Sequence, residues 1–339
     1  MPIPESLSHG LRLPVIGAPM FIISNPDLVI AQCTAGIIGA FPSLNPRAPA
    51  RLDEWLEQIT QALAAHDAAH PERPAAPYAV NLIVHRSNPR LMEDLAICAR
   101  FKVPLIITSL GANEAVNAAV HQWGGLVFHD VINQRFARKA VEKGADGLIL
   151  VAAGAGGHAG AQSPFALVAE TRAWFDGPIA VSGAIATGAG ILAARAMGGD
   201  FAYIGSPFIA TDEAHASAAY KQGIVEGDAA DIVYSSYFTG VHGNYLRASI
   251  LAQNLDPDAL PQSNPSAMDF AKATSAKAWR DIWGAGQGIG AVSQVVPAAR
   301  LIAQLATGYA AARAGLCERA RPGDAGGSAT KPAIPSTGA

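Results

Sequence analysis

One histidine of this chain lies in a stretch made otherwise of glycine and alanine. The stretch is Gly154-Ala155-Gly156-Gly157-His158-Ala159-Gly160, and it directly follows the apolar run Gly147–Val151. Glycines allow the backbone to approach a planar or phosphorylated ligand closely, and histidine has a pKa near neutrality, which suits proton transfer. We therefore predict that His158 is an acid/base residue facing a bound cofactor. The alternative is a flexible glycine loop with a solvated histidine.

The same stretch also matches G-x-G-x-x-A, a variant of the dinucleotide-binding fingerprint. A site of that kind requires an acidic residue at the end of the next strand. Here Asp176 precedes the apolar run Ile179–Ser182 instead of following it. The dinucleotide interpretation is therefore weak.

Two further turns combine glycine with hydroxyl-bearing residues. The first is Ser182-Gly183-Ala184-Ile185-Ala186-Thr187-Gly188, in which Thr187 is a good helix N-cap, and the second is Tyr203-Ile204-Gly205-Ser206-Pro207. Backbone amides in such turns can hold a phosphate group where a helix begins. Either turn alone could be an ordinary tight turn. As a pair on consecutive strands, they predict a phosphate site.

Five other polar residues are weaker candidates for the site. His129 and Asp130 end an apolar run and would either line a pocket or have a structural role, whereas His242, Tyr245 and Arg247 lie in a segment that could cover a substrate. The chain contains no HExxH, GxxxxGK[ST] or GxSxG motif. The sequence therefore gives no support for a metalloprotease, a P-loop protein or a hydrolase, and we predict no metal site.

The elements that must position these residues follow a regular alternation. Short apolar runs with no polar alternation, typical of buried parallel strands, are separated by amphipathic helical stretches. Gly144 and Gly198 stand where the left-handed cap of a helix is expected. The predicted helices include Pro26–Thr34, Leu52–Ala65, Arg90–Arg100 and Gln134–Lys143. The predicted strands are Val15–Ala18, Ile37–Ala40, Tyr78–Leu82, Leu105–Thr108, Leu126–His129, Gly147–Val151, Ile179–Ser182 and Phe201–Ile204.

Eight such strands favour an α/β fold of the (β/α)8 TIM-barrel type over a doubly wound sheet, which usually has fewer strands. The alternation stops after Thr211, and a helical pattern resumes at Val292–Arg313. We therefore predict a barrel formed by residues 1–211 and 285–316, with a smaller, mainly helical domain at 212–284 inserted after strand eight to cover the substrate. Residues 317–339, rich in small and polar residues, are expected to form a flexible tail.

Composition excludes several classes of partner. Lys and Arg number 24 against 27 Asp and Glu without a basic stripe, so nucleic acid is not an expected partner. The three cysteines have no metal-site or disulfide spacing, which favours the reducing cytoplasm. The first residues lack the pattern of a signal peptide, and no apolar run is long enough for a membrane span.

Taken in order, the motifs resemble those of nitronate monooxygenases, formerly called 2-nitropropane dioxygenases. The resemblance covers roughly residues 11–313 and is specific as a set, although each motif is short. It is carried by Pro14-Val15-Ile16-Gly17-Ala18-Pro19-Met20, Asn81, Gly156-Gly157-His158, Ser182-Gly183, Gly205-Ser206 and Ala285-Gly286-Gln287-Gly288-Ile289-Gly290.

The resemblance implies an FMN-containing barrel in which His158 is the catalytic base. Ala18, Pro19 and Met20 would lie along the flavin, and Asn81 would form a hydrogen bond to it. Gly156 and Gly157 would border the cofactor. The phosphate would be held by the two later turns, at Ser182, Gly183, Tyr203, Ile204, Gly205 and Ser206.

The chain departs from the family at two places next to this histidine. Many members carry a glutamine seven residues before it and Glu-Ala directly before Gly-Gly-His, where this chain has Val151 and Gly154-Ala155. Loss of the glutamine removes a polar contact to the flavin ring. The departure leaves the subgroup and the preferred substrate open.

The expected activity is oxidation of alkyl nitronates or nitroalkanes by molecular oxygen. One alternative is an FMN enzyme that uses NAD(P)H to reduce an activated double bond, as an enoyl reductase does, or a quinone. A barrel that binds a phosphorylated metabolite without flavin is the non-redox alternative. Use of NAD(P)H and assembly into a homo-oligomer are left open by the residues.

Overall fold

A barrel of eight parallel strands organises the chain. The computed structural model describes residues 3–262 and 277–319. The barrel strands are β1 (Val15–Gly17), β2 (Gly39–Pro42), β3 (Tyr78–Ile83), β4 (Leu105–Ser109), β5 (Leu126–Val131), β6 (Gly147–Val151), β8 (Ile179–Ser182) and β9 (Phe201–Ile204). All eight predicted strands are present, and β2 begins two residues later than predicted.

The strands pair in the order β1-β9-β8-β6-β5-β4-β3-β2. The two ends of this series meet where Ile16 bridges to Ile38, and Gly17 N donates a hydrogen bond of 2.8 Å to Ile38 O. The sheet is therefore closed into a barrel, which removes its exposed edges. The predicted TIM-barrel class is confirmed, and a doubly wound sheet is excluded.

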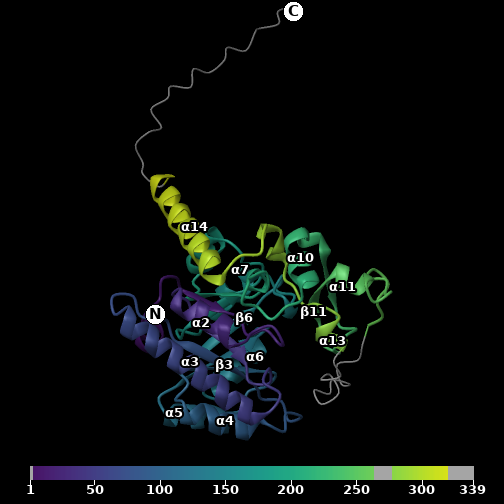
Figure 1. Cartoon of the computed structure of the whole chain (residues 1–339). Helices are drawn as coiled ribbons and strands as arrows, with labels where there is room; N and C mark the ends of the chain where they lie inside the picture. The colour runs from purple at the N-terminus through teal and green to yellow at the C-terminus, as the bar shows by residue number, and fades with distance from the viewer. Residues whose placement is uncertain (1–2, 263–276, 320–339) are drawn as a thin grey trace, which may run out of the picture.

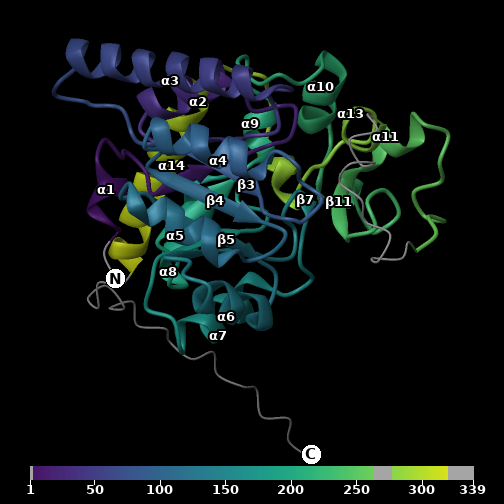
Figure 2. The same cartoon turned by 90° about the horizontal axis from the view of Figure 1, so that it is seen from below.

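Helices surround the strands (Figures 1 and 2). They are α2 (Pro26–Thr34), α3 (Pro49–Ala69), α4 (Leu91–Arg100), α5 (Glu114–Gln122), α6 (Gln134–Glu142), α7 (Pro164–Arg172), α8 (Gly188–Ala196) and α14 (Ala298–Arg319). The predicted caps are confirmed, because Gly144 and Gly198 have φ of 88° and 107° and Thr187 accepts a hydrogen bond from Gly190 N. The helix predicted at Val292–Arg313 begins and ends six residues later than expected.

Alternation along the strands separates two apolar layers. A lumen cluster fills the barrel and includes Ile16, Ile107, Phe128 and Phe201, whereas the neighbouring residues on the same strands pack under the helices. The short helix α1 (Glu5–Ser8), which the pattern did not predict, contributes the fully buried Leu7 to the lumen cluster. The lumen is thus a packed core, and its chemistry is confined to the carboxyl ends of the strands.

The segment after β9 begins with α9 (Ser206–Ile209) against the barrel core and continues, from α10 (Ala218–Glu226) on, into a lobe beside the barrel, on the right in Figures 1 and 2. Its further elements are η1 (Ala229–Asp231), β10 (Ile232–Ser235), β11 (Gly243–Leu246), α11 (Arg247–Leu251), α13 (Lys277–Arg280) and η3 (Gln287–Ala291). An insertion after strand eight is therefore present, and its strands β10 and β11 extend to β7 (Gly157–His158) in a three-stranded sheet.

The predicted domain boundaries stay predictions. Residues 317–319, placed in the tail, continue α14, and the rest of the predicted tail lies outside the described residues. Cys33, Cys98 and Cys317 are free thiols. Among the described helices, none combines the length and apolar character that crossing a membrane requires.

An ion pair at the amino-terminal ends of β8 and β9 joins the barrel to α7. Arg172 is paired with Asp200, and its guanidinium also donates to the carbonyls of Gly177 (2.6 Å) and Gly198 (2.7 Å). The Asp200 side chain is only 8% exposed and accepts a further bond from Ile179 N. This end of a barrel is where structural rather than catalytic residues are expected.

We predict that Arg172→Ala lowers the free energy of unfolding by about 3 kcal/mol, because it removes the guanidinium that pairs directly with a buried carboxylate. Arg195→Ala is the matched control. Arg195 lies 3.8 Å from the same carboxylate with 37% of its side chain exposed, and its loss should cost about 1 kcal/mol or less. Urea denaturation measures both, and equal losses would contradict the assignment.

Candidate active site

The loop between β6 and β7 requires its glycines. Gly154 and Gly157 have φ of 84° and 68°, in the left-handed region that favours glycine. A Cβ on Gly156 would lie 2.8 Å from Gly286 N, closer than such atoms approach. A Cβ on Gly154 would lie 2.9 Å from Gln287 Oε1, the end of a flexible side chain that can move, so it is the positive φ at Gly154 that disfavours any other residue there.

Three of the predicted motifs meet at this loop. Gly154 O accepts hydrogen bonds from Ala184 N at 3.3 Å and from Gln287 N at 2.9 Å. Ser206 Oγ accepts a bond of 2.8 Å from Gly286 N. The histidine loop, the turns after β8 and β9, and the glycine motif at 285–290 therefore form one contiguous structure at the carboxyl end of the barrel.

His158 is held between the barrel and the inserted lobe. Its Nε2 lies 2.9 Å from Thr239 Oγ1, and its ring packs edge-on against Trp279 with centroids 5.3 Å apart. Burial lowers the pKa of His158 to about 4. The imidazole is therefore neutral at physiological pH, as a group that accepts a proton must be.

The turns after β8 and β9 offer donors suited to an anion. Neither Gly183 N nor Gly205 N makes a hydrogen bond to any other described residue. The two amides stand at the ends of paired neighbouring strands, since Ser182 is opposite Tyr203. Gly183 has φ of 134°, which suits glycine. Unpaired amides at the ends of adjacent strands are donors of the kind that a phosphate group accepts from.

The turn after β1 lies against the turn after β9. Ala18 N donates to Ile204 O at 2.8 Å, and a Cβ on Gly205 would lie 3.4 Å from Ala18 Cβ and 3.8 Å from Met20 Sδ. The predicted group Ala18, Pro19 and Met20 is thus adjacent to the turn after β9, one of the two that are predicted to hold a phosphate. The side chain of Ile204 is fully buried in the outer apolar layer, so only its backbone can face a ligand.

A chain of polar side chains lines the lumen beneath this site. Asn81 Nδ2 donates to Ser109 Oγ at 2.7 Å, and Ser109 Oγ donates to Asp130 Oδ2 at 2.5 Å. Burial raises the pKa of Asp130 to about 6, although the bonds from Ser109 and from the Leu110 amide oppose the rise. Burial and the Asp130 carboxyl together raise the pKa of Tyr203, which also belongs to the lumen layer.

His129 and Asp130, considered together in the sequence, face opposite ways. Phe128, two residues before Asp130, belongs to the lumen cluster, whereas Val127 belongs to the layer under the helices. His129 therefore points away from the lumen, and its Nδ1 lies 2.6 Å from Thr108 Oγ1. Burial lowers the pKa of His129 to about 4. The ring is therefore neutral at physiological pH, and its place under the helices indicates a structural role.

The structure also separates the three candidates in the inserted lobe. Tyr245 is fully buried, with its hydroxyl 3.4 Å from Thr239 Oγ1 beside His158. Arg247 instead forms two bonds of 2.8 Å with Asp258. His242 stacks on Tyr234 at 5.0 Å.

Sequence reasoning missed Thr239, Trp279 and Ser109. Each is a single residue without a motif, and only its distance to His158 or Asp130 marks it. Asn244 was also missed, although its buried amide donates to Ala155 O at 2.6 Å and so fixes the histidine loop.

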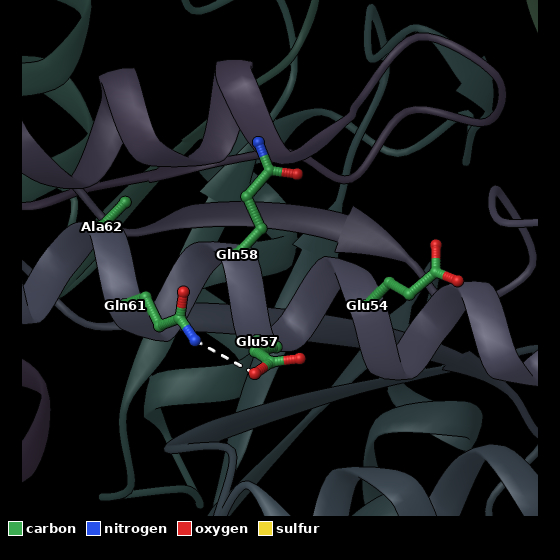
Figure 3. A pocket seen from close by; sticks show the side chains of 5 residues that line it. All are labelled: Glu54, Glu57, Gln58, Gln61 and Ala62. Atoms are coloured by element: carbon green, nitrogen blue, oxygen red, sulfur yellow. Dashed lines mark hydrogen bonds between the residues drawn. The ribbon is translucent and has the colours of Figure 1, made fainter.

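Val151 lies at the end of β6 in the lumen layer. The residue that replaces the family's glutamine therefore presents an apolar surface to the mouth of the barrel. A shallow hollow on the outer helix α3, lined by Glu54, Glu57, Gln58, Gln61 and Ala62, lies on a different face (Figure 3).

Comparison with known proteins agrees with this geometry. Residues 6–308 match the family described as nitronate monooxygenase. The chain belongs to the nitronate monooxygenase family. It is therefore an oxidoreductase, as the motifs predicted. A nitronate monooxygenase of Paraburkholderia phytofirmans is 26% identical over 87% of this chain and 92% of its own length.

A second relative differs in its activity. An octahydroindene-carboxyl-CoA dehydrogenase of Mycobacterium tuberculosis is 24% identical over 71% of this chain and 65% of its own length. Two solved structures share the fold. FabK of Thermotoga maritima has a TM-score of 0.78 at 22% identity, covering 93% of this chain and 97% of FabK. Nitroalkane oxidase of Streptomyces ansochromogenes has a TM-score of 0.76 at 23% identity, covering 92% and 100%.

We predict that Asp130→Asn changes how stability depends on pH. A carboxyl whose folded pKa is raised to about 6 contributes stability that is present at low pH and is lost as pH rises from about 4 through 6. Asparagine keeps the acceptor for Ser109 without the charge. The difference in the free energy of unfolding, variant minus wild type, should rise by on the order of 2 kcal/mol between pH 4.5 and pH 7.5. Urea denaturation measures this difference, and the same difference at both pH values would contradict the prediction.

Proposed function

We propose that this member of the family is an FMN-dependent monooxygenase that oxidises alkyl nitronates and nitroalkanes with molecular oxygen, with His158 as the general base. The observation that carries the proposal is the neutral, partly buried imidazole on a glycine loop at the carboxyl end of the barrel. The free thiols support a reducing cytoplasmic location.

The residues present fit both the phosphate and the ring of FMN. Gly183 and Gly205, with the neighbouring Ser182 and Ser206, would hold its phosphate through their unpaired amides. Asn81 would bind the ring from the lumen side, next to Ala18, Pro19, Met20, Gly156, Gly157 and Tyr203. FMN would supply the electron-accepting chemistry that no amino-acid side chain provides.

The protein's own part of the reaction is proton transfer and orientation. The C–H bond next to the nitro group breaks, its electron pair stays on the substrate as the nitronate, and the proton moves to His158. The low polarity around the imidazole, with Trp279 on one side, disfavours a resting positive charge and keeps the base available. A substrate that arrives as the nitronate does not need this step.

The second candidate is NAD(P)H-dependent reduction of an activated double bond, with His158 as proton donor. It is supported by the similarity to the carboxyl-CoA dehydrogenase, which acts on a CoA thioester. Oxygen uptake with a nitronate distinguishes the first function, and NAD(P)H consumption with an enoyl thioester distinguishes the second. In a related alternative, the electrons from NAD(P)H would pass to a quinone instead of a double bond.

We predict that His158→Asn binds FMN and folds normally but loses ~10²-fold or more of kcat/KM with a neutral nitroalkane, the usual contribution of a general base. Asparagine occupies similar space without accepting the proton. With preformed nitronate the loss should be much smaller. Steady-state oxygen uptake with both substrate forms measures the difference, and equal losses would show that His158 only orients the ligand.

We predict that Gly205→Val weakens FMN binding at least ~10-fold while the barrel stays folded, because a branched side chain would fill the space before the Gly205 amide. The protein itself tolerates a Cβ there, at ordinary contact distance from Ala18. Gly183→Val is a poorer probe, since its Cβ would lie 2.7 Å from Ala153 O and strain the fold directly.

Quenching of FMN fluorescence measures that affinity, and far-ultraviolet circular dichroism reports the fold. Mass spectrometry of the cofactor released from wild type should identify FMN rather than FAD. Unchanged affinity in Gly205→Val would place the phosphate elsewhere.

A further inference from the structure

The hydroxyl of Thr239 makes three contacts inside the inserted lobe. Its Oγ1 lies 3.0 Å from Val241 O, 2.9 Å from His158 Nε2 and 3.4 Å from the Tyr245 hydroxyl. A threonine hydroxyl has one proton to donate and two lone pairs to accept with. Three partners therefore use its whole capacity, and the chemistry of each partner decides the direction of each bond.

The Val241 contact fixes where the Thr239 proton goes. A carbonyl oxygen can only accept, and no other described residue donates to Val241 O. The Thr239 proton is therefore given to Val241. Because that proton is used there, the 3.4 Å contact with the fully buried Tyr245 hydroxyl can be a hydrogen bond only with Tyr245 as the donor.

The remaining lone pair of Thr239 faces the imidazole. Because Thr239 has no second proton, His158 Nε2 must be the donor and must carry the hydrogen. In a neutral imidazole only one nitrogen is protonated, so Nδ1 carries the free lone pair. No described residue forms a hydrogen bond to Nδ1, which leaves it available to a substrate.

We propose that Thr239 is a positioning residue that holds His158 in the Nε2–H form, so that Nδ1 is the nitrogen that exchanges the proton with the substrate. The inference rests on the proposed function for its catalytic consequence, but not for the assignment of the proton. When Nδ1 takes the substrate proton, the Nε2–H bond to Thr239 stays in place and disperses the new positive charge. Trp279 fixes the plane of the ring.

The assignment is tested first by nitrogen NMR of the full chain loaded with FMN and labelled at histidine with ¹⁵N. The His158 signals are identified by their loss in His158→Asn. We expect a protonated Nε2 and an unprotonated Nδ1 at pH 7. A proton on Nδ1 instead would overturn the proposal, whatever the activity of the enzyme.

Thr239→Val tests the consequence, with Thr239→Ser as the matched control. Valine has nearly the shape of threonine but no acceptor, so the two tautomers should mix and kcat/KM with a neutral nitroalkane should fall ~10-fold, about the worth of a hydrogen bond to a developing charge. KM should change little. Serine should restore both the spectrum and the rate, and nitronate turnover should be nearly unaffected. Thr307→Val, exposed on α14, should alter neither quantity.

The two ideas fail in different ways. If His158→Asn turns over the neutral nitroalkane as fast as wild type, the general-base function is wrong, but the NMR result still decides the tautomer. If His158→Asn is impaired while Thr239→Val keeps wild-type rate and a single Nε2–H signal, the base is right and Thr239 does not position it. Thr239→Val leaves the buried Tyr245 hydroxyl without this partner, so its fold is checked by circular dichroism, and Thr239→Ser, which keeps the hydroxyl, tests the assignment independently.

Discussion

The site depends on one short piece of antiparallel pairing between the barrel and the inserted lobe. His158 of β7 is opposite Gly243 of β11, and Gly157 is opposite Asn244. The approach is so close that a Cβ on Gly243 would lie 2.7 Å from Gly157 O. This pairing brings Thr239 and Tyr245 to the imidazole, which a loop of glycine and alanine cannot orient by itself. The lobe therefore helps to hold the imidazole in place.

Glycine has different functions in different parts of this site. In the histidine loop and at Gly286 it removes side chains so that backbones from distant segments can touch. At Gly183 it permits a backbone conformation that leaves an amide without an internal partner. At Gly205 it keeps space open beside the amide. The same residue type thus allows close packing in one turn and leaves a backbone amide uncovered in another.

Two acid/base groups whose pKa values shift in opposite directions lie at the barrel mouth. Burial depresses the pKa of His158 and raises that of Asp130, and each group is therefore pushed toward its neutral form. Val151, where many relatives have glutamine, adds to the apolar character of this mouth. The imidazole is therefore uncharged at physiological pH, whereas the Asp130 carboxyl still ionises as the pH rises through about 6.

The sequence by itself determined the barrel, because eight buried parallel strands leave continuous apolar runs and glycine caps that are local signals. It also determined His158 and the two phosphate turns as candidates, since glycine next to a strand end is visible in a short motif. Only the tertiary structure decided between His129 and Asp130, whose neighbouring positions on β5 face opposite layers. It alone revealed Thr239, which lies 81 residues from His158 in the chain, because a hydrogen bond between distant segments leaves no periodic trace in either.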